Sequence, residues 1–339
     1  LYLGPVVSPP GGYGDILGAS VSTEQEVKEV LDRIASSGTA GVKTCVEKGW
    51  NVLGRKLPRH SDAILQRIKK ESDKRKLPIY VHASCEEDLT RALNLGIHAL
   101  AHPIIIRNER LSDSFIEKMK QTSTYQMSTL SISDSELSHF NLKRLDNPAL
   151  EMIVPKIELA FAKDYKKRML ALAMLFSFGF SSPKLDNASI NFFRRHSNIA
   201  VFLGKILKAV YKQGQTKFLA SSKDAIQRLY KAGVPIVLGS DTVASPCSLF
   251  GFHGFLTLRE LELLGESGLP PKDAIEAATI TPAKMLGIEK EVGTIEIGKQ
   301  ADLIIVHDNP MDNLQAMRTL RWTIKNGIAN TPEQWMLNY

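Results

Sequence analysis

Short apolar runs alternate with amphipathic stretches along most of this 339-residue chain. Six runs have the length and the β-branched or aromatic content of buried strands, and they cover residues 1–7, 40–45, 77–83, 97–103, 124–132 and 234–242. Five stretches carry apolar residues at helical spacing: 22–38, 60–76, 84–96, 113–123 and 221–233. Strands that alternate with helices in this way form βαβ units with parallel strands and right-handed crossovers. The pattern therefore predicts an α/β protein built on a parallel sheet.

Six strands are two fewer than a (β/α)8 barrel contains. We predict a TIM (β/α)8 barrel over residues 1–292, with its first strands upstream of Leu1, because the chain begins without methionine on a strand-like run. Residues 134–218 interrupt the alternation and predict a long, basic and mostly helical insertion. The stretch GTIEIGKQADLIIVHD, residues 293–308, predicts two short strands joined by a turn at Gly298 and Lys299. We expect residues 293–339 to form the C-terminal part of a small β-sandwich and a tail.

Composition removes several classes of protein. A hydrophobic content of 43% is enough for one large core. The net charge of +7 is moderate and the basic residues are spread along the chain, so no nucleic-acid partner is expected. No apolar run is long enough to span a membrane. Three cysteines are few and odd in number, which argues against a disulfide framework and favours the cytoplasm.

Two successive predicted strands end in histidine. His82 closes the run 77–83, and His102 closes the run 97–103. The carboxyl ends of parallel strands are where α/β barrels and open α/β sheets carry out their chemistry. One histidine at a strand end is usually a satisfied polar residue, but two at the same level are harder to explain in that way. His98 comes early in its strand, at the opposite end of the sheet, and we assign it a structural role.

Two more polar residues fall at the same level of the predicted sheet. Lys43 lies in the strand AGVKTC, and Asp241 ends the strand VPIVLGSDT. Taken alone, a strand-end aspartate is more often a turn residue and a rim lysine more often reaches solvent. Together with the two histidines, however, they converge on one face. Two imidazoles and a carboxylate are a ligand set typical of Zn²⁺, which a lysine could join only as a carbamate.

Several motifs occur in an order that resembles the amidohydrolase superfamily, in its imidazolonepropionase-like and prolidase-like branch. They are VHA at 81–83, AHP at 101–103, AGVPIVLGSDT at 232–242 and the long stretch at 258–310. The resemblance covers most of the chain apart from the insertion. It implies a metal-dependent hydrolase that cleaves an amide or peptide-like C–N bond in a small molecule or dipeptide, with one or two divalent ions, most simply Zn²⁺.

The resemblance also implies roles for individual residues. Lys43 holds the place of the lysine, often carboxylated in the family, that bridges two metal ions. His82 and His102 match the histidines that bind the second ion. Asp241 matches the aspartate that binds the first ion and moves the proton, which makes it the catalytic residue.

Other positions are less firmly assigned by the resemblance. SPPGGYGD, residues 8–15, is similar to a loop of the same branch in which histidine often stands in place of Tyr13, so Tyr13 is a candidate substrate contact. His253 follows the last strand and is another. The family's His-x-His pair is absent from these residues. Either it lies upstream of Leu1, which we prefer, or the site is degenerate.

Two alternative functions stay open. A deaminase of the same superfamily carries His-x-x-Glu at the fifth strand, but Cys85 stands at that spacing from His82 and Glu86 follows one position later. A non-catalytic scaffold could instead use the basic stretch 191–212 of the insertion to contact a protein or a membrane surface. The simpler role for that stretch is a helical lid or a contact within a homo-oligomer, which we expect this protein to form.

Overall fold

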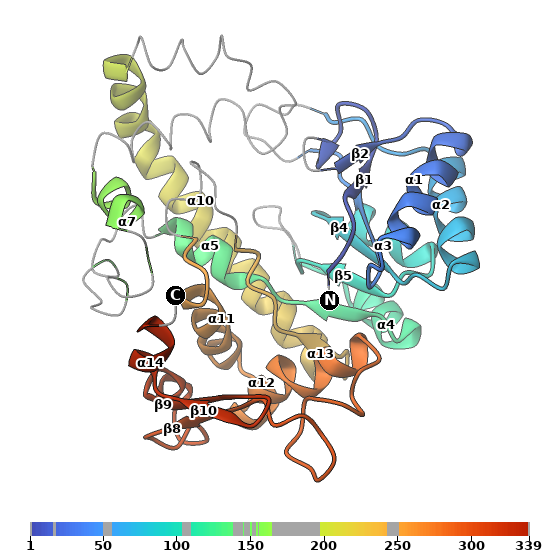
Figure 1. Ribbon diagram of the computed structural model, residues 1–339. Helices are drawn as coiled ribbons and strands as arrows, with labels where there is room; N and C mark the ends of the chain where they lie inside the picture. Colours follow the sequence, from blue (N-terminus) through green and yellow to red (C-terminus); the bar gives the residue numbers. More distant parts are fainter. Residues whose placement is uncertain are drawn as a thin grey trace.

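The computed structural model describes most of the chain outside the insertion and a few loops. The described residues are 2–15, 18–49, 56–103, 110–137, 145, 150, 154, 156–164, 197–242 and 251–337. The main sheet is entirely parallel, and its order is β2-β1-β3-β4-β5-β6-β7 (Figure 1). Its strands are β1 (Val6–Ser8), β2 (Gly18–Ser20), β3 (Val42–Val46), β4 (Ile79–Ala83), β5 (Ala99–Ala101), β6 (Tyr125–Met127) and β7 (Ile236–Val237).

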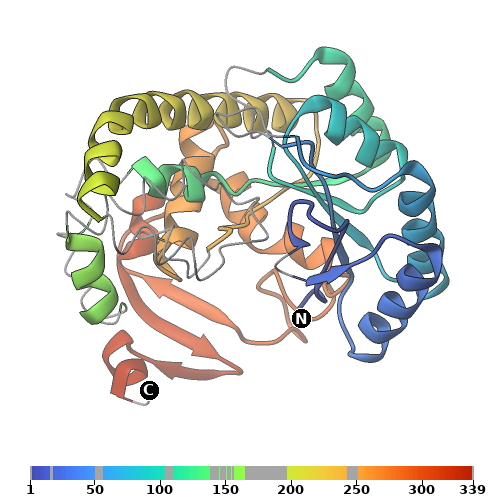
Figure 2. The ribbon, with the colours of Figure 1, turned by 90° about the horizontal axis from the view of Figure 1, so that it is seen from above.

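Helices lie along the outer face of this curved sheet (Figure 2). Those of the barrel are α1 (Glu24–Ser36), α2 (Asp62–Lys74), α3 (Glu86–Asn94), α4 (Asp113–Thr122), α5 (Leu130–Leu137), α10 (Ser197–Lys231), α11 (Phe255–Glu266), α12 (Pro271–Ala278) and α13 (Ile280–Met285). Several begin where the sequence supplies a capping side chain. Thr23 and Glu26 form a capping box at α1, and Ser61 and Ser112 cap α2 and α4. Strands inside and helices outside, in chain order, are the arrangement of a (β/α)8 barrel.

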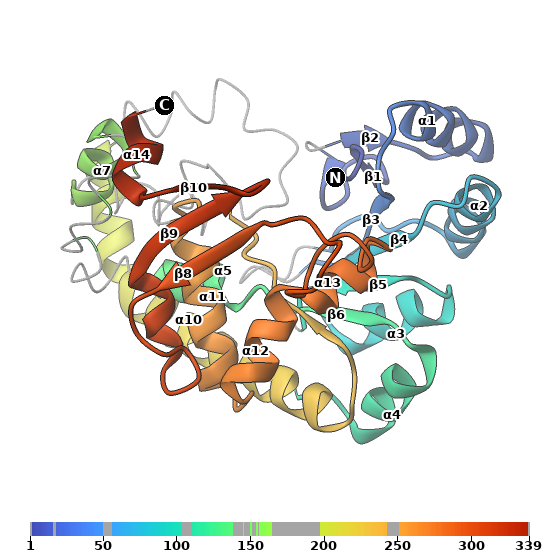
Figure 3. The same ribbon diagram turned by 60° about the horizontal axis from the view of Figure 1, so that its bottom comes forward.

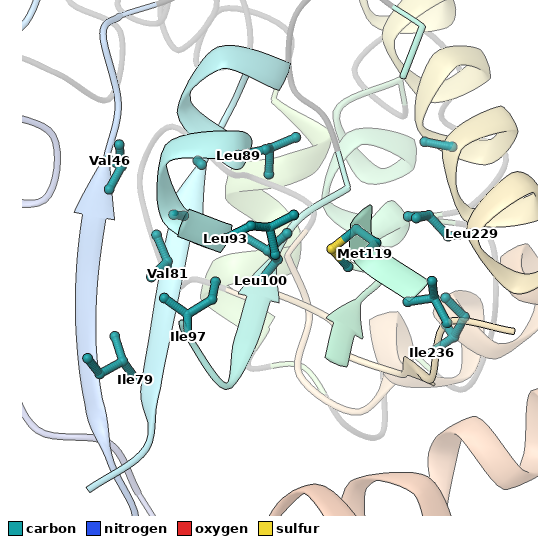
Figure 4. Packing of buried hydrophobic residues seen from close by; sticks show 14 of the residues in the cluster. Val46, Ile79, Val81, Leu89, Leu93, Ile97, Leu100, Met119, Leu229 and Ile236 are labelled. Atoms are coloured by element: carbon teal, nitrogen blue, oxygen red, sulfur yellow. The ribbon is translucent and has the colours of Figure 1, made fainter. Parts of the chain in front are cut away.

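The core lies between the sheet and these helices. Val81 and Leu100 project from neighbouring strands toward α3, whose Leu89 and Leu93 pack against them (Figure 4). All four side chains are at most 3% exposed. Each contributes about 1.5–3 kcal/mol by leaving water. The core therefore fixes the strands from their outer face and leaves their carboxyl ends to carry polar residues.

The register places those carboxyl ends at one level. His82 in β4 is opposite Ala101 in β5, Ala101 is opposite Met127 in β6, and Met127 is opposite Val237 in β7. Residues at or after these positions in the four neighbouring strands therefore lie along the same edge of the sheet, where the strands end.

Three details of the α/β part differ from the sequence prediction. β1 begins later than the predicted run 1–7, at Val6, and β2, which pairs with β1, lies in residues for which no strand was predicted. The predicted strand 124–132 ends at Met127, and α5 begins at Leu130. The predicted insertion ends inside α10, because this helix continues through residue 218 into the predicted helix 221–233. The insertion is helical where it is described, in α5, α7 (Lys156–Lys163) and α10, and most of its other residues lie outside the described chain.

The C-terminal residues form a second, antiparallel sheet in the order β10-β9-β8 (Figure 3). Its strands are β8 (Leu303–Val306), β9 (Leu320–Lys325) and β10 (Ile328–Asn330), and η4 (Leu314–Arg318) and α14 (Pro332–Leu337) accompany them. The strand predicted before Gly298 is wrong, because residues 294–297 form no strand and Ile297 is fully exposed. One sheet of the predicted sandwich is thus present in the described chain. Among the described residues, none of the helices has both the length and the apolar character needed to cross a bilayer.

A candidate metal centre at the strand ends

The structure brings together the four residues that the sequence assigned to a metal site. His82 is the penultimate residue of β4, and His102 follows β5 directly. Their ring centroids are 4.9 Å apart, with the rings nearly perpendicular. Asp241 lies beyond β7, with its Oδ2 atom 3.9 Å from Nδ1 of His102. Lys43 is the second residue of β3 and is opposite Tyr80 of β4, two residues before the level of His82, so the prediction that it lies level with the histidines is wrong. Its charge nevertheless acts on the pKa of both imidazoles.

Backbone bends give the site its shape. His102, Thr129 and Asp241 follow three adjacent strands, and all three have positive φ angles, of 70°, 46° and 46°. This left-handed region is unfavourable for residues other than glycine: each such residue costs about 1–3 kcal/mol, and the conformation persists only where its surroundings impose it. The hydroxyl of Thr129 lies 2.7 Å from Nδ1 of His102, so two of the bent residues are joined directly.

His82 is enclosed on several sides. The ring of Tyr13 stacks on it, with centroids 4.0 Å apart and planes 7° from parallel. Its Nε2 atom lies 3.4 Å from Oε2 of Glu47, the residue after β3. Within the described residues, neither atom has a hydrogen-bond partner, although both side chains are buried. A carboxylate beside one ring nitrogen is the usual way to orient a histidine whose other nitrogen binds a metal ion.

The electrostatics keep both imidazoles neutral at pH 7. Burial lowers the pKa of His82 well below its usual value, and the charge of Lys43 lowers it further. Burial also lowers the pKa of His102 to about 3, although Asp241 opposes this change. A neutral imidazole retains the lone pair that a metal ion requires. Burial lowers the pKa of the Lys43 amine as well, which favours the neutral form that a carbamate is made from.

The donor types therefore fit a divalent metal ion: two neutral imidazoles, a carboxylate and an amine of lowered pKa. Among the described residues, however, no three side chains of His, Cys, Asp or Glu converge closely enough to enclose an ion. These residues form one wall of a site, and their roles as ligands stay predictions.

Of the two candidate substrate contacts, only Tyr13 joins this cluster. Burial raises the pKa of its hydroxyl well above the usual value, and the charge of Asp241 is the next cause. Tyr13 thus stays protonated and can donate a hydrogen bond. His253 is exposed, before α11, and no hydrogen bond, ion pair or ring contact in the described chain joins it to the cluster.

Sequence reasoning missed Glu47 and Thr129. Glu47 stands in the charged stretch VEKGW, where a carboxylate after a strand is ordinary. Thr129 fell inside a predicted strand, and nothing about a β-branched residue suggests a left-handed bend. The only available signal was that each of them follows a parallel strand neighbouring one that ends in a candidate ligand.

Comparison with known proteins identifies the family. A model described as the amidohydrolase family matches residues 54–329. The chain belongs to this family, as the motifs in its sequence indicated. A 5'-deoxyadenosine deaminase of Methanobrevibacter smithii is 30% identical over 136 residues, which are 39% of this chain and 31% of that protein. An imidazolonepropionase of Symbiobacterium thermophilum is 38% identical over 80 residues, 24% of this chain and 18% of that protein. The matched regions thus span less than a third of these relatives.

Solved structures resemble the chain over nearly its whole length. A Xaa-Pro dipeptidase with methionine bound in its active site has a TM-score of 0.63 at 19% identity, covering 96% of this chain and 66% of that one. The ochratoxinase of A. niger has a TM-score of 0.62 at 17% identity, covering 97% and 65%. At these identities the likeness shows the fold alone, and it confirms the predicted barrel class.

Proposed function

We propose that this protein is a metal-dependent amidohydrolase that cleaves an amide or peptide-like C–N bond. The observation that carries the proposal is the convergence of two neutral imidazoles, His82 and His102, with Asp241 at the strand ends of an amidohydrolase-family chain. The family generally uses divalent metal ions. Zn²⁺ suits this donor set, because imidazole nitrogen and carboxylate oxygen are its ordinary ligands.

His82, His102 and Asp241 would hold the ion, and Lys43 would join them if its amine is carboxylated. A bound ion would polarise the scissile carbonyl and lower the pKa of a water molecule. The low pKa values of both imidazoles keep them from protonation down to mildly acidic pH, so the ligand set would persist there.

Asp241 is placed to move a proton between water and substrate. Its side chain is 45% exposed, compared with 12% for His102, so a substrate can reach it. As a general base it would take the proton of the attacking water, and as a general acid it would give this proton to the leaving nitrogen. Tyr13, held protonated beside His82, would donate a hydrogen bond to the carbonyl oxygen as negative charge develops there.

Dipeptides, N-acyl amino acids and cyclic amides are the substrate classes to test first. A deaminase is the second candidate, because a 5'-deoxyadenosine deaminase is among the relatives. Its acidic residue could not be Glu86, however. Both carboxylate oxygens of Glu86 accept hydrogen bonds from Ser112, one from the backbone N–H and one from the hydroxyl, at 2.6 Å each. This carboxylate is thus used in joining α3 to α4, and Cys85 is buried beside it.

The decisive experiment measures zinc binding and turnover together. The full-length protein, purified from zinc-supplemented cells, is assayed for metal content and for hydrolysis of the three amide classes and deamination of adenosine analogues. We expect at least one zinc ion per chain and turnover of an amide. His82→Ala and His102→Ala should each lose both zinc and activity, while His253→Ala, at an exposed histidine outside the cluster, should keep them.

Other results would point elsewhere. Release of ammonia from a purine, with no amide cleaved, would make the protein a deaminase. If the protein binds no zinc and is inert on every substrate, the remaining hypothesis is a non-catalytic scaffold that uses residues 191–212 as its contact surface. Sedimentation of the same sample tests the proposed homo-oligomer.

A further inference from the structure

We propose that Glu260, in α11, is a positioning residue that holds both His102 and Asp241 in place through the segment Ser128–Ser131. Glu260 itself has no hydrogen bond to His102 or Asp241, and it acts through the residues it binds. The inference rests on the proposed metal-dependent hydrolase, because it concerns how two of that enzyme's residues are oriented.

The first observation is the bonding of the Glu260 carboxylate. This side chain is fully buried, in contact with the start of α5. Its Oε1 accepts hydrogen bonds from the hydroxyl of Ser128 and, at 2.9 Å, from the backbone N–H of Leu130. Its Oε2 accepts one from the backbone N–H of Ser131. The first N–H groups of a helix have no partner within the helix, and a carboxylate at this end also interacts favourably with the helix dipole. One side chain of α11 thus fixes the connection between β6 and α5.

The second observation is what this connection carries. Thr129 stands in its middle with a φ of 46°, and its hydroxyl lies 2.7 Å from Nδ1 of His102. At the end of the connection, the hydroxyl of Ser131 donates to the carbonyl oxygen of Ser240, 3.2 Å away. Ser240 directly precedes Asp241. The same four residues therefore reach both the imidazole after β5 and the aspartate after β7.

The hydrogen bond to Thr129 bears on which ring nitrogen of His102 carries the proton. If Nδ1–H donates to the Thr129 hydroxyl, Nε2 keeps its lone pair and is available to a metal ion. A hydroxyl can either donate or accept, but the carboxylate of Asp241, 3.9 Å from the same Nδ1, favours a proton on that nitrogen, so that Thr129 accepts the hydrogen bond.

The hydrogen bond depends on the position of Thr129, whose left-handed backbone persists only where its neighbours impose it. Bonds to Glu260 on both sides of Thr129, at Ser128 and Leu130, supply that constraint. Without them the hydroxyl is free to leave, and His102 can take either neutral form.

The third observation is that the connection lies beside the segment that follows β7. A Cβ atom added at Gly239 would lie 3.3 Å from Cγ2 of Thr129 and 3.4 Å from Cε of Met127. Gly239, two residues beyond β7, therefore lies beside Thr129, so the connection and the segment that leads to Asp241 are direct neighbours. His102 and Asp241 should change together when Glu260 is altered.

The test substitutes one carboxylate oxygen by an amide. In Glu260→Gln, the side-chain NH₂ group replaces one of the two oxygens and must face the backbone N–H of either Leu130 or Ser131, so one of these two hydrogen bonds is lost and its donor is repelled. Glu262→Gln is the matched control, because Glu262 lies on the same helix and is also largely buried but pairs with Arg259 and Arg318 instead. Both variants lose charge-assisted bonds of α11, and only the first loses contact with the connection.

The primary readout is the tautomer of His102 in the metal-free protein, from ¹⁵N NMR of labelled histidine at pH 8, with the His102→Gln spectrum as assignment. We expect a single Nδ1–H form in the parent and in Glu262→Gln, and a mixture of both forms in Glu260→Gln. Zinc affinity from a chelator competition and kcat should each fall about 10–100-fold in Glu260→Gln, with KM changing much less. Identical behaviour of the two variants in all three measurements would overturn the proposal.

Thr129→Val guards against a Glu260 variant that does not fold. This change removes only the hydroxyl, and the same mixture of tautomers and the same loss of zinc affinity are expected. A Thr129→Val protein with the parent's tautomer would equally overturn the proposal. If the parent itself neither binds zinc nor turns over any amide, the proposed function fails, while the tautomer measurement still decides what Glu260 does.

Discussion

Strands β4 and β8 are both short apolar runs, IYVHA and LIIV, but they lie in very different surroundings. All five residues of β4 are buried, whereas none of the four in β8 is. Ile304 and Ile305, on opposite faces of β8, are 48% and 45% exposed. β4 pairs with strands on both sides and is covered by α3, while among the described residues β8 pairs only with β9. The stabilisation from an apolar run thus depends on what covers it, and its composition alone does not reveal this.

The chemistry follows the same division. His82, His102 and Asp241 lie at or just beyond the carboxyl ends of strands of the parallel sheet, where parallel neighbours bring equivalent strand ends to one edge. In the antiparallel sheet, neighbouring strands end at opposite edges, so its polar residues do not gather in this way. The two sheets should therefore respond differently to the same substitution.

The largest difference should be in activity. Asp241→Asn should lower kcat by about 10²–10⁴-fold, because an amide cannot take up the water's proton. Asp302→Asn is the matched change beside β8, where the carboxylate accepts a hydrogen bond from the backbone N–H of Asn326 at 2.8 Å. Its kcat should equal the parent's. Steady-state kinetics at saturating zinc measures both, and an Asp241→Asn enzyme as fast as the parent would remove the proposed proton transfer.

A stability difference should separate the cores of the two sheets. Leu100→Ala in β5 deletes a fully buried side chain and should lower the free energy of unfolding by about 2–5 kcal/mol. Ile305→Ala in β8 should cost less than about 1 kcal/mol, because the side chain is already 45% exposed. Urea unfolding followed by fluorescence provides both values. Equal losses would mean that β8 is covered by something in solution.

The free energy of unfolding should depend on pH through Glu260, which is buried beside the parallel sheet. Burial raises the pKa of this carboxyl to about 7, against the hydrogen bonds from Ser128, Leu130 and Ser131. The folded state therefore holds the proton more tightly than the unfolded state, whose pKa is about 4.3. The resulting stabilisation is complete below that value and is lost as pH rises through 7, up to about 3 kcal/mol in all. On the same two helices, α11 and α5, Arg259 and Asp134 pair with each other, and Glu262 pairs with Arg259 and Arg318.

Removing this titration should flatten the pH profile. Between pH 5 and pH 8, the parent should lose more unfolding free energy than Glu260→Gln, whose amide does not titrate. Denaturant unfolding at four pH values measures the two slopes. If the unfolding free energies of the two proteins change with pH in parallel, the pKa of Glu260 is an ordinary one, because the hydrogen bonds that its carboxylate accepts offset the effect of burial.

The smallest effects should come from helix caps in the two regions. Thr23 caps α1, which packs beside α2 on the parallel sheet, and Thr23→Ala should cost about 1 kcal/mol. Asn313 caps the short η4, where its side chain accepts from the N–H of Gln315 at 2.9 Å. Asn313→Ala should cost less, because fewer residues depend on that turn. Thermal unfolding of the two variants ranks them, and the reverse order would contradict this view of the C-terminal sheet.

Much of the parallel sheet could be predicted because buried parallel strands are continuous apolar runs. Those runs located the ends of β4 and β5, and with them His82 and His102. The antiparallel sheet was less predictable. Residues 294–297 alternate apolar and polar side chains as a half-buried strand does, but no neighbour pairs with them, so the pattern alone was misleading.

The supporting residues could not be found because their roles exist only after folding. Glu260 lies in LRELELL, an ordinary amphipathic helix in which a glutamate is expected to face solvent. It is buried because α11 meets the start of α5, a contact between segments 130 residues apart. Thr129 likewise occurs in an apolar run that continues past the true end of β6. Local patterns predicted which residues end strands, and long-range contacts decided which residues hold them there.

The left-handed backbone at His102, Thr129 and Asp241 implies a trade-off between stability and the proposed activity. Each of these residues is strained by its positive φ angle, and glycine would relieve this strain. Substitution by glycine could therefore raise the free energy of unfolding, but it would remove a side chain of the proposed site. Selection for heat resistance alone would drive glycine or asparagine into these three positions. Under the proposed function, these replacements would remove a metal ligand, the threonine that orients it and the proton-transfer group.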